Sequence, residues 1–130
     1  MEWDVVFDES RGAAIVSTRG KFNATDHARM VEDVVSRAQW RPGHPVMFDH
    51  RGLDFGAAGF ATMSAARDTH MAHEARIGAA RTAILMKSIA DFGTGRQFQL
   101  LLDGAVSADV RVFVDEKAAW EWLAAKQDEA

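Results

Sequence analysis

Thr82-Ala83-Ile84-Leu85-Met86 is a short apolar run, and Ser88-Ile89-Ala90-Asp91 follows it almost at once. The run has the length and the boundaries of a buried strand. The second stretch is typical of a helix start, and apolar side chains then recur at the spacing of one helical face (i, i+3, i+4, i+7): Phe98, Leu101, Leu102 and Ala105. A buried strand that leads directly into a helix indicates an α/β protein.

The same alternation extends in both directions along the chain. Residues 3–8 alternate apolar and polar side chains, and residues 13–19 form a second strand-like run after a turn, so a hairpin is predicted. Asn23 can cap the helix that follows. The predicted order is β-β-α-β-α-β-α-β-α, with strands at 3–8, 13–19, 45–49, 82–86 and 110–114 and helices at 24–40, 60–73, 88–105 and 116–126. We expect one domain over residues 1–130, with a largely parallel sheet.

Composition narrows the classes of function. The chain has 130 residues, of which 48% are hydrophobic, and this argues against disorder. Fifteen basic residues face nineteen acidic ones, so the net charge of -4 argues against nucleic-acid binding. The absence of cysteine excludes disulfides, thiolate catalysis and cysteine-ligated metals. With no apolar run long enough to span a membrane and no signal-like leader, we expect a soluble, cytoplasmic protein.

Several motifs in the last third of the chain resemble those of the SpoIIAA-like group of the STAS superfamily (sulphate transporter and anti-sigma factor antagonist domains). They are Arg81–Met86, Phe92-Gly93, Arg96–Gln99, Val110–Asp115 and Ala118–Leu123. The resemblance implies helices packed on a five-stranded mixed sheet, with about four helices and an N-terminal hairpin. It implies no cofactor and no known reaction. Members of the superfamily act as protein-interaction modules, and some bind nucleotides or lipids.

One loop departs from the pattern of that group. In anti-sigma factor antagonists, the loop after the third strand ends in Asp-Ser-Ser-Gly, and a kinase phosphorylates one of these serines. In the matching stretch, Leu53 to Phe60, the serine positions are occupied by Ala57 and Ala58. The phosphorylation switch should therefore not operate here. The small residues from Gly56 to Gly59 either pack a helix closely on the sheet or let a partner or ligand approach a helix N-terminus.

Polar residues that follow the strands are the first candidates for a site, because ligands bind outside the carboxyl ends of strands in open α/β sheets. The rule selects Lys21, Asp49, His50, Arg51, Lys87, Ser88 and Asp115. Asp49-His50-Arg51 is the richest stretch and could form a surface loop or the rim of a ligand site. An enzyme centred on these three residues is a further hypothesis. However, adjacent residues on a strand point to opposite faces, so we assign no catalytic residue.

Three further sequence patterns are weaker indications of a site or of packing. His70, His73 and Glu74 have the spacing of one helical face, but two histidines and a carboxylate near a helix end are a weak metal signal, and we assign no metal. Gly93-Thr94-Gly95-Arg96 lacks the Lys-Ser/Thr of a phosphate loop, and its two glycines favour close packing or a loosened first helical turn instead. Trp120 and Trp122 cannot share a helical face, so one should be buried and the other partly exposed.

Two functions follow from these patterns. The first is a non-enzymatic STAS-like interaction or regulatory module that lacks the usual phosphoacceptor serine and binds a protein partner or itself. The alternative is a carrier with a pocket near Phe55, Phe60 and Phe92 at the carboxyl edge of the sheet, which takes a small apolar or anionic ligand or a lipid. We expect no cofactor and no metal. The predicted partner or ligand contacts are Asp49, His50, Arg51, Phe55, Gly56, Ala57, Ala58, Phe60, Ser88 and Phe92.

Overall fold

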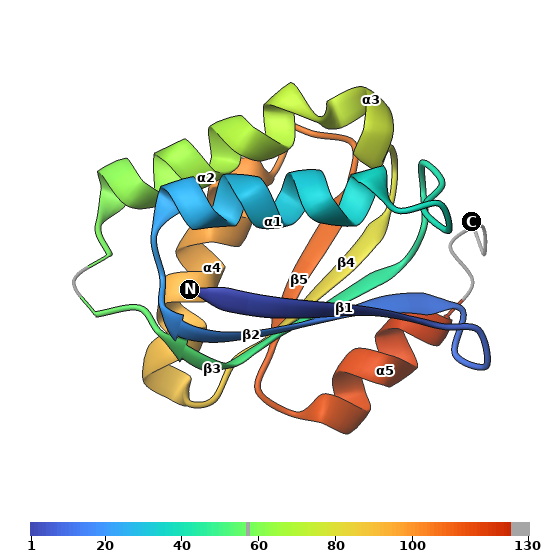
Figure 1. Cartoon of the computed structure of the whole chain (residues 1–130). Helices are drawn as coiled ribbons and strands as arrows, with labels where there is room; N and C mark the ends of the chain where they lie inside the picture. Colours follow the sequence, from blue (N-terminus) through green and yellow to red (C-terminus); the bar gives the residue numbers. More distant parts are fainter. Residues whose placement is uncertain (57, 126–130) are drawn as a thin grey trace.

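The computed structural model describes residues 1–56 and 58–125 (Figure 1). Five strands form one sheet in the order β1-β2-β3-β4-β5; only the β1–β2 pair is antiparallel. The strands are β1 (Glu2–Asp8), β2 (Ala13–Lys21), β3 (Val46–Asp54), β4 (Arg81–Leu85) and β5 (Asp109–Phe113). The helices are α1 (Ala24–Ser36), α2 (Phe60–Ala72), the single turn α3 (Glu74–Ile77), α4 (Ile89–Leu102) and α5 (Glu116–Ala124). The mixed five-stranded α/β fold predicted from sequence is confirmed.

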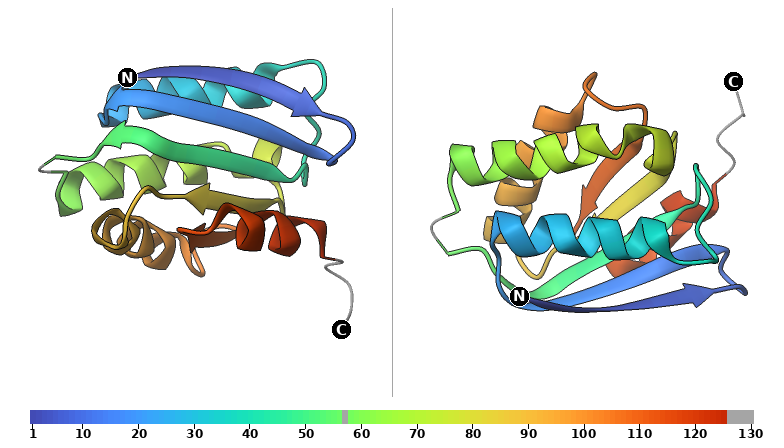
Figure 2. Two further views of the ribbon diagram at one scale, coloured as in Figure 1. Left: turned by 90° about the horizontal axis from the view of Figure 1, so that it is seen from below. Right: turned by 45° about the horizontal axis from the view of Figure 1, so that its top comes forward.

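The helices divide unequally between the two faces of the sheet. Because the strands are arranged in chain order, right-handed crossovers carry each connecting helix to the same face. Figures 1 and 2 show α1, α2 and α4 on that face and α5 on the other. The larger core therefore lies between the sheet and α1, α2 and α4. A smaller core lies under α5, formed by Met47, Ala83, Leu85, Ala119 and Leu123.

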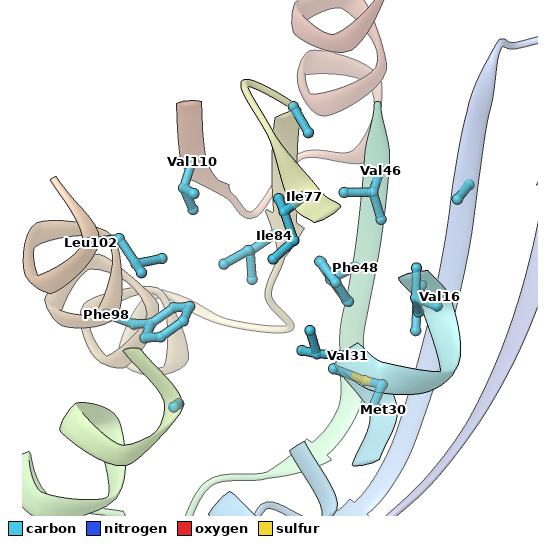
Figure 3. Packing of buried hydrophobic residues seen from close by; sticks show 14 of the residues in the cluster. Val16, Met30, Val31, Val46, Phe48, Ile77, Ile84, Phe98, Leu102 and Val110 are labelled. Atoms are coloured by element: carbon cyan, nitrogen blue, oxygen red, sulfur yellow. The ribbon is translucent and has the colours of Figure 1, made fainter. Parts of the chain in front are cut away.

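The larger core joins alternate residues of the central strands to the helices above them. Val16, Phe48 and Ile84 come from β2, β3 and β4 and are almost fully buried. Figure 3 shows them among side chains from the helical layer, including Met30, Val31, Phe98 and Leu102. Because of this alternation, side chains of neighbouring β3 residues point into different cores. Two polar side chains can therefore contact each other only if they lie on the same face of the sheet.

Several helix starts agree with the sequence prediction. Asn23 caps α1, since its Oδ1 accepts a hydrogen bond from the backbone N–H of Asp26 at 2.8 Å. Ser88 caps α4 in the same way through the N–H of Asp91 at 3.2 Å. Within the described residues, none of the helices is long and apolar enough to cross a membrane.

Three predicted features were wrong. The first helix ends at Ser36 rather than at residue 40, because the chain turns there and the Trp40 indole donates a hydrogen bond to the carbonyl of Arg76 at 2.7 Å. The third strand continues five residues beyond Asp49, so residues 49–51 are not a loop. Trp120 and Trp122 are both half-buried, since each packs against an arginine, Arg11 at 4.2 Å and Arg81 at 5.0 Å from the ring centroid.

Candidate ligand-binding site

Three of the five histidines are buried together beneath the helices. His27 of α1, His50 of β3 and His70 of α2 are only 4%, 6% and 5% exposed. The ring centroids of His27 and His70 lie 5.3 Å apart. The Phe98 ring of α4 is near both, with its centroid 6.0 Å from that of His27 and 5.4 Å from that of His70. Imidazole and phenyl rings thus share the space where α1, α2 and α4 meet over the sheet.

A small cavity lies beside these rings. Its volume is about 20 Å³, which is room for about one water molecule. The side chains around it are mostly apolar and aromatic, and none carries a formal charge at neutral pH: Phe22, His27, His50, Phe55, Met63, Ala66, Ile84, Met86, Thr94, Gly95 and Phe98. A second cavity of about 20 Å³ is lined by His70 together with Val31, Trp40, Phe48 and other residues. We call the first of these the histidine–phenylalanine pocket.

The pocket lies at the carboxyl edge of the sheet. Phe22 directly follows the last residue of β2, Phe55 follows β3, and Met86 follows β4. The rings of Phe22 and Phe55 pack against each other with centroids 5.3 Å apart. Phe22 also packs on His27 at 5.6 Å. The three parallel strands therefore deliver apolar side chains to one place, where ligands bind in open α/β sheets.

An irregularity in the β2–β3 pairing positions His50. The register shifts between Ser17 and Arg19, and at this bulge the Thr18 hydroxyl donates a hydrogen bond to the carbonyl of Asp49 at 3.1 Å. Because that uses the only hydroxyl proton, the Nδ1–H of His50 donates to Thr18 Oγ1 at 2.7 Å. A Cβ at Gly52 would lie 2.6 Å from the Thr18 carbonyl oxygen, so the bulge requires glycine there.

The other two imidazoles are not satisfied in this way. Both ring nitrogens of His27 and the Nε2 of His70 are buried and have no hydrogen-bond partner within residues 1–56 and 58–125. A buried polar atom that lacks a partner costs about 1–3 kcal/mol, so such atoms are rare in native proteins. His27 is therefore the polar group of the pocket that calls for an explanation.

All three imidazoles are neutral at pH 7. Burial lowers the pKa of His50 to about 4, although the nearby Asp49 carboxylate opposes the shift. Burial also lowers the pKa of His70 to about 4, with a smaller contribution from His73. The pKa of His27 is lowered well below its ordinary value by burial and then by His70 and His50. A neutral imidazole offers one hydrogen-bond donor and one acceptor.

The Asp49-His50-Arg51 stretch is divided between the two faces of the sheet. The Arg51 guanidinium bonds the Asp49 carboxylate at 2.9 Å and lies 3.1 Å from Glu116, on the face that carries α5. Hydrogen bonding to Arg51 holds the pKa of Asp49 below its ordinary range. His50 points into the larger core on the opposite face. The Asp49 carboxylate therefore does not orient the His50 imidazole.

Only some of the remaining predicted contact residues line the pocket. Phe55 lines it, while Phe92 is half-buried against the larger core. Phe60 is 73% exposed and does not line the pocket. The Ser88 hydroxyl is occupied as the cap of α4.

The small-residue loop leads into α2. The N–H of Gly56 donates to Asp54 Oδ1 at 2.8 Å, and the N–H of Ala58 donates to the Phe55 carbonyl at 2.8 Å. Ala57 lies outside the described residues.

The two weaker candidates do not form sites. His70 points inward, whereas His73 Nε2 lies 3.5 Å from Glu32 and the Glu74 carboxylate accepts a hydrogen bond from the N–H of Ser107 at 3.0 Å. In the glycine-containing turn of α4, a Cβ at Gly95 would lie 2.6 Å from Met86 Cε and 3.0 Å from Val112 Cγ1. Gly95 is thus closely packed, whereas a Cβ at Gly93 would meet no atom within 4 Å.

His27 was not among the site residues predicted from sequence, although the sequence carries a signal for it. His27, Met30, Val31 and Val34 follow the i, i+3, i+4, i+7 spacing of a buried helical face. Likewise Met63, Ala66 and His70 follow i, i+3, i+7 on α2. A histidine inside an apolar stripe marks a buried imidazole, and two such stripes facing one sheet could have identified this pair.

Comparison with known proteins places the fold. A solved structure from Shewanella loihica PV-4, an uncharacterized protein from the DUF3478 family with a SpoIIAA-like fold, matches 94% of this chain and 92% of its own, with a TM-score of 0.62 and 15% sequence identity. The fold is SpoIIAA-like. The predicted resemblance to the SpoIIAA-like group is thereby confirmed for the fold. No known family matches the chain by sequence, and no curated protein does so either.

Proposed function

We propose that this chain is a STAS-like binding module that takes a small ligand into the histidine–phenylalanine pocket. The observation that carries the proposal is His27, whose two ring nitrogens are buried beside the pocket and have no partner in the described part of the chain. A buried polar group such as this imidazole lowers stability when it has no hydrogen-bond partner, so we expect it to have one when the protein functions. A ligand would supply that partner.

The position of the pocket supports the same function. Side chains that directly follow β2, β3 and β4 surround it, and the carboxyl end of parallel strands is where α/β folds bind ligands. At about 20 Å³ the pocket is too small for anything larger than water, so binding requires Phe22 or Phe55 to turn aside. Both residues stand in connecting segments just outside the strands, where backbone and side chains can adjust without breaking the sheet.

Calorimetric melting in the presence of phenol tests this function. Phenol at about ten times its dissociation constant should raise the melting temperature by about 4 °C. Ala66→Leu fills the pocket, because Ala66 is 1% exposed and lines it, so the rise should disappear in this variant. Ala65→Leu, on the exposed side of the same helix, is the matched control and should keep the rise. An equal response in all three proteins, or none in the wild type, would overturn the proposal.

A second candidate function is self-association through exposed apolar side chains. Phe60 and Ile89 are the first residues of α2 and α4, and they are 73% and 83% exposed. Large apolar side chains as exposed as these mark an interface where they form one contiguous patch. The module would then act without a serine switch, since Ala57 and Ala58 have no hydroxyl. Light scattering should show an oligomer that Phe60→Ser together with Ile89→Ser converts to monomer; a monomeric wild type would exclude self-association.

A further inference from the structure

We infer that the ligand of the histidine–phenylalanine pocket is a small neutral molecule with a ring-shaped apolar body and one hydroxyl, which His27 recognises. The inference rests on the proposed binding function and adds the chemical class of the ligand. Three properties of the lining lead to it: its lack of charge, its aromatic walls and the unpaired nitrogens of His27.

The absence of charge excludes ions as the bound species. None of the residues that line the pocket is Lys, Arg, Asp or Glu. Asp26, Asp49 and Asp54 each directly precede a lining residue in the sequence. Each is bonded elsewhere: Asp26 to the N-terminal ammonium group, Asp49 to Arg51, and Asp54 to the backbone N–H of Gly56. The three imidazoles are themselves neutral at pH 7. A carboxylate or an ammonium ion would therefore lose its hydration without meeting an opposite charge, which is strongly unfavourable.

The aromatic side chains that line the pocket favour a ligand with a flat ring. Phe22, Phe55 and Phe98 line the pocket, and the centroids of neighbouring rings lie 5.3 to 6.2 Å apart, the range of ordinary aromatic packing. The thioethers of Met63 and Met86 complete the lining. Methionine side chains are flexible and pack well on aromatic rings, so they can adapt to a flat guest.

The unpaired nitrogens favour a hydroxyl. A neutral imidazole presents one N–H donor and one bare nitrogen, and a hydroxyl both donates and accepts hydrogen bonds. A pure hydrocarbon would fill the space but leave His27 unpaired. One hydroxyl can therefore pair with one of the two His27 nitrogens, as donor or as acceptor, and this hydrogen bond discriminates between guests of the same shape.

Titration calorimetry at pH 7.5 with phenol, toluene and benzoate tests the class. Phenol and toluene differ only in hydroxyl against methyl, and benzoate carries a charge. We expect phenol to bind at least about fivefold more tightly than toluene, the effect of one hydrogen bond, and benzoate not to bind. In His27→Leu the preference for phenol should vanish while toluene still binds. His73→Leu, which alters an imidazole outside the pocket lining, is the control and should keep the preference.

The outcomes separate the two proposals. Toluene binding as tightly as phenol, or benzoate binding at all, would overturn the ligand class and leave the pocket as a binding site. Failure of all three probes to bind the folded wild-type protein would overturn both. Circular dichroism of His27→Leu shows whether the variant is folded. If it is not, the phenol-to-toluene ratio of the wild type still decides the class.

Discussion

The imidazole rings of His27 and His70 lie 5.3 Å apart and are inclined by 31°, yet no hydrogen bond joins them. They come from α1 and α2, the two helices that lie side by side over the sheet in Figure 1. The helices thus bury two polar rings in contact without using their hydrogen-bonding capacity. A fold selected for stability alone would place apolar residues there, so this pair is the strongest sign of a function in the interior.

Replacing His27 with leucine should increase stability. The variant removes two buried nitrogens that have no partner within the described residues. Leucine fills the same space with an apolar side chain of similar size. We expect the free energy of unfolding, measured by urea denaturation, to rise by about 1 kcal/mol. His50→Leu is the comparison, because His50 is hydrogen-bonded to Thr18 and its loss should not stabilise the protein. A loss of 2 kcal/mol or more in His27→Leu would show that His27 is already satisfied.

Stability should fall as the pH falls from about 6.5 to about 4. The pKa values of His50 and His70 in the folded protein are about 4, below the ordinary value of 6.5, so in this window the unfolded chain takes up protons that the folded chain does not. The two histidines contribute fully to the free energy of unfolding well above pH 6.5. By pH 4 each histidine has lost about 3 kcal/mol of that contribution.

Asp49 opposes the lowering of the pKa of His50, and His70 adds to it. His73 adds to the lowering of the pKa of His70. Urea denaturation across this range measures the effect. His70→Leu should make the pH dependence shallower. Constant stability between pH 7 and pH 5 would contradict the burial of neutral imidazoles.

Two glycines of α4 should respond in opposite directions to alanine. At Gly95 a Cβ would lie 2.6 Å from the flexible end of Met86 and 3.0 Å from Val112 Cγ1, so Gly95→Ala should destabilise the protein by about 1 kcal/mol. At Gly93 no atom lies within 4 Å of the added Cβ, so Gly93→Ala should stabilise the helix by about 0.5–1 kcal/mol. Thermal melting of both variants tests the packing of α4 on the sheet. The same sign for both changes would refute it.

The loop before α2 should not be phosphorylated. No serine stands at positions 54–60, and the nearest, Ser64, has its Oγ buried against the helix layer. Residues 54–60 carry no hydroxyl group, so peptide mass spectrometry after incubation with a serine kinase should find no phosphate on them. Phosphate on Ser64 would mean that α2 opens, and it would restore the switch that the alanines at 57 and 58 argue against.

Local patterns predicted the fold better than the site. The apolar runs before Asp49 and Lys87 predicted two strands, and the caps at Asn23 and Ser88 predicted two helix starts, because these signals act within a few residues. The pocket depends on side chains far apart in sequence. His50 faces the larger core by the same alternation as Val46 and Phe48, but Leu53 faces it only because the β2–β3 bulge shifts the alternation. That shift follows from pairing between strands rather than from either strand alone.

Small ligands should enter the histidine–phenylalanine pocket. The most direct measurement is the nuclear Overhauser effect between phenol protons and the methionine ε-methyl groups of the protein. We predict contacts from phenol to Met63 and Met86, which line the pocket, and none to Met71, which lies on α2 but is exposed. Contacts to Met71 alone, or none at saturating phenol, would show that the pocket does not receive the guest.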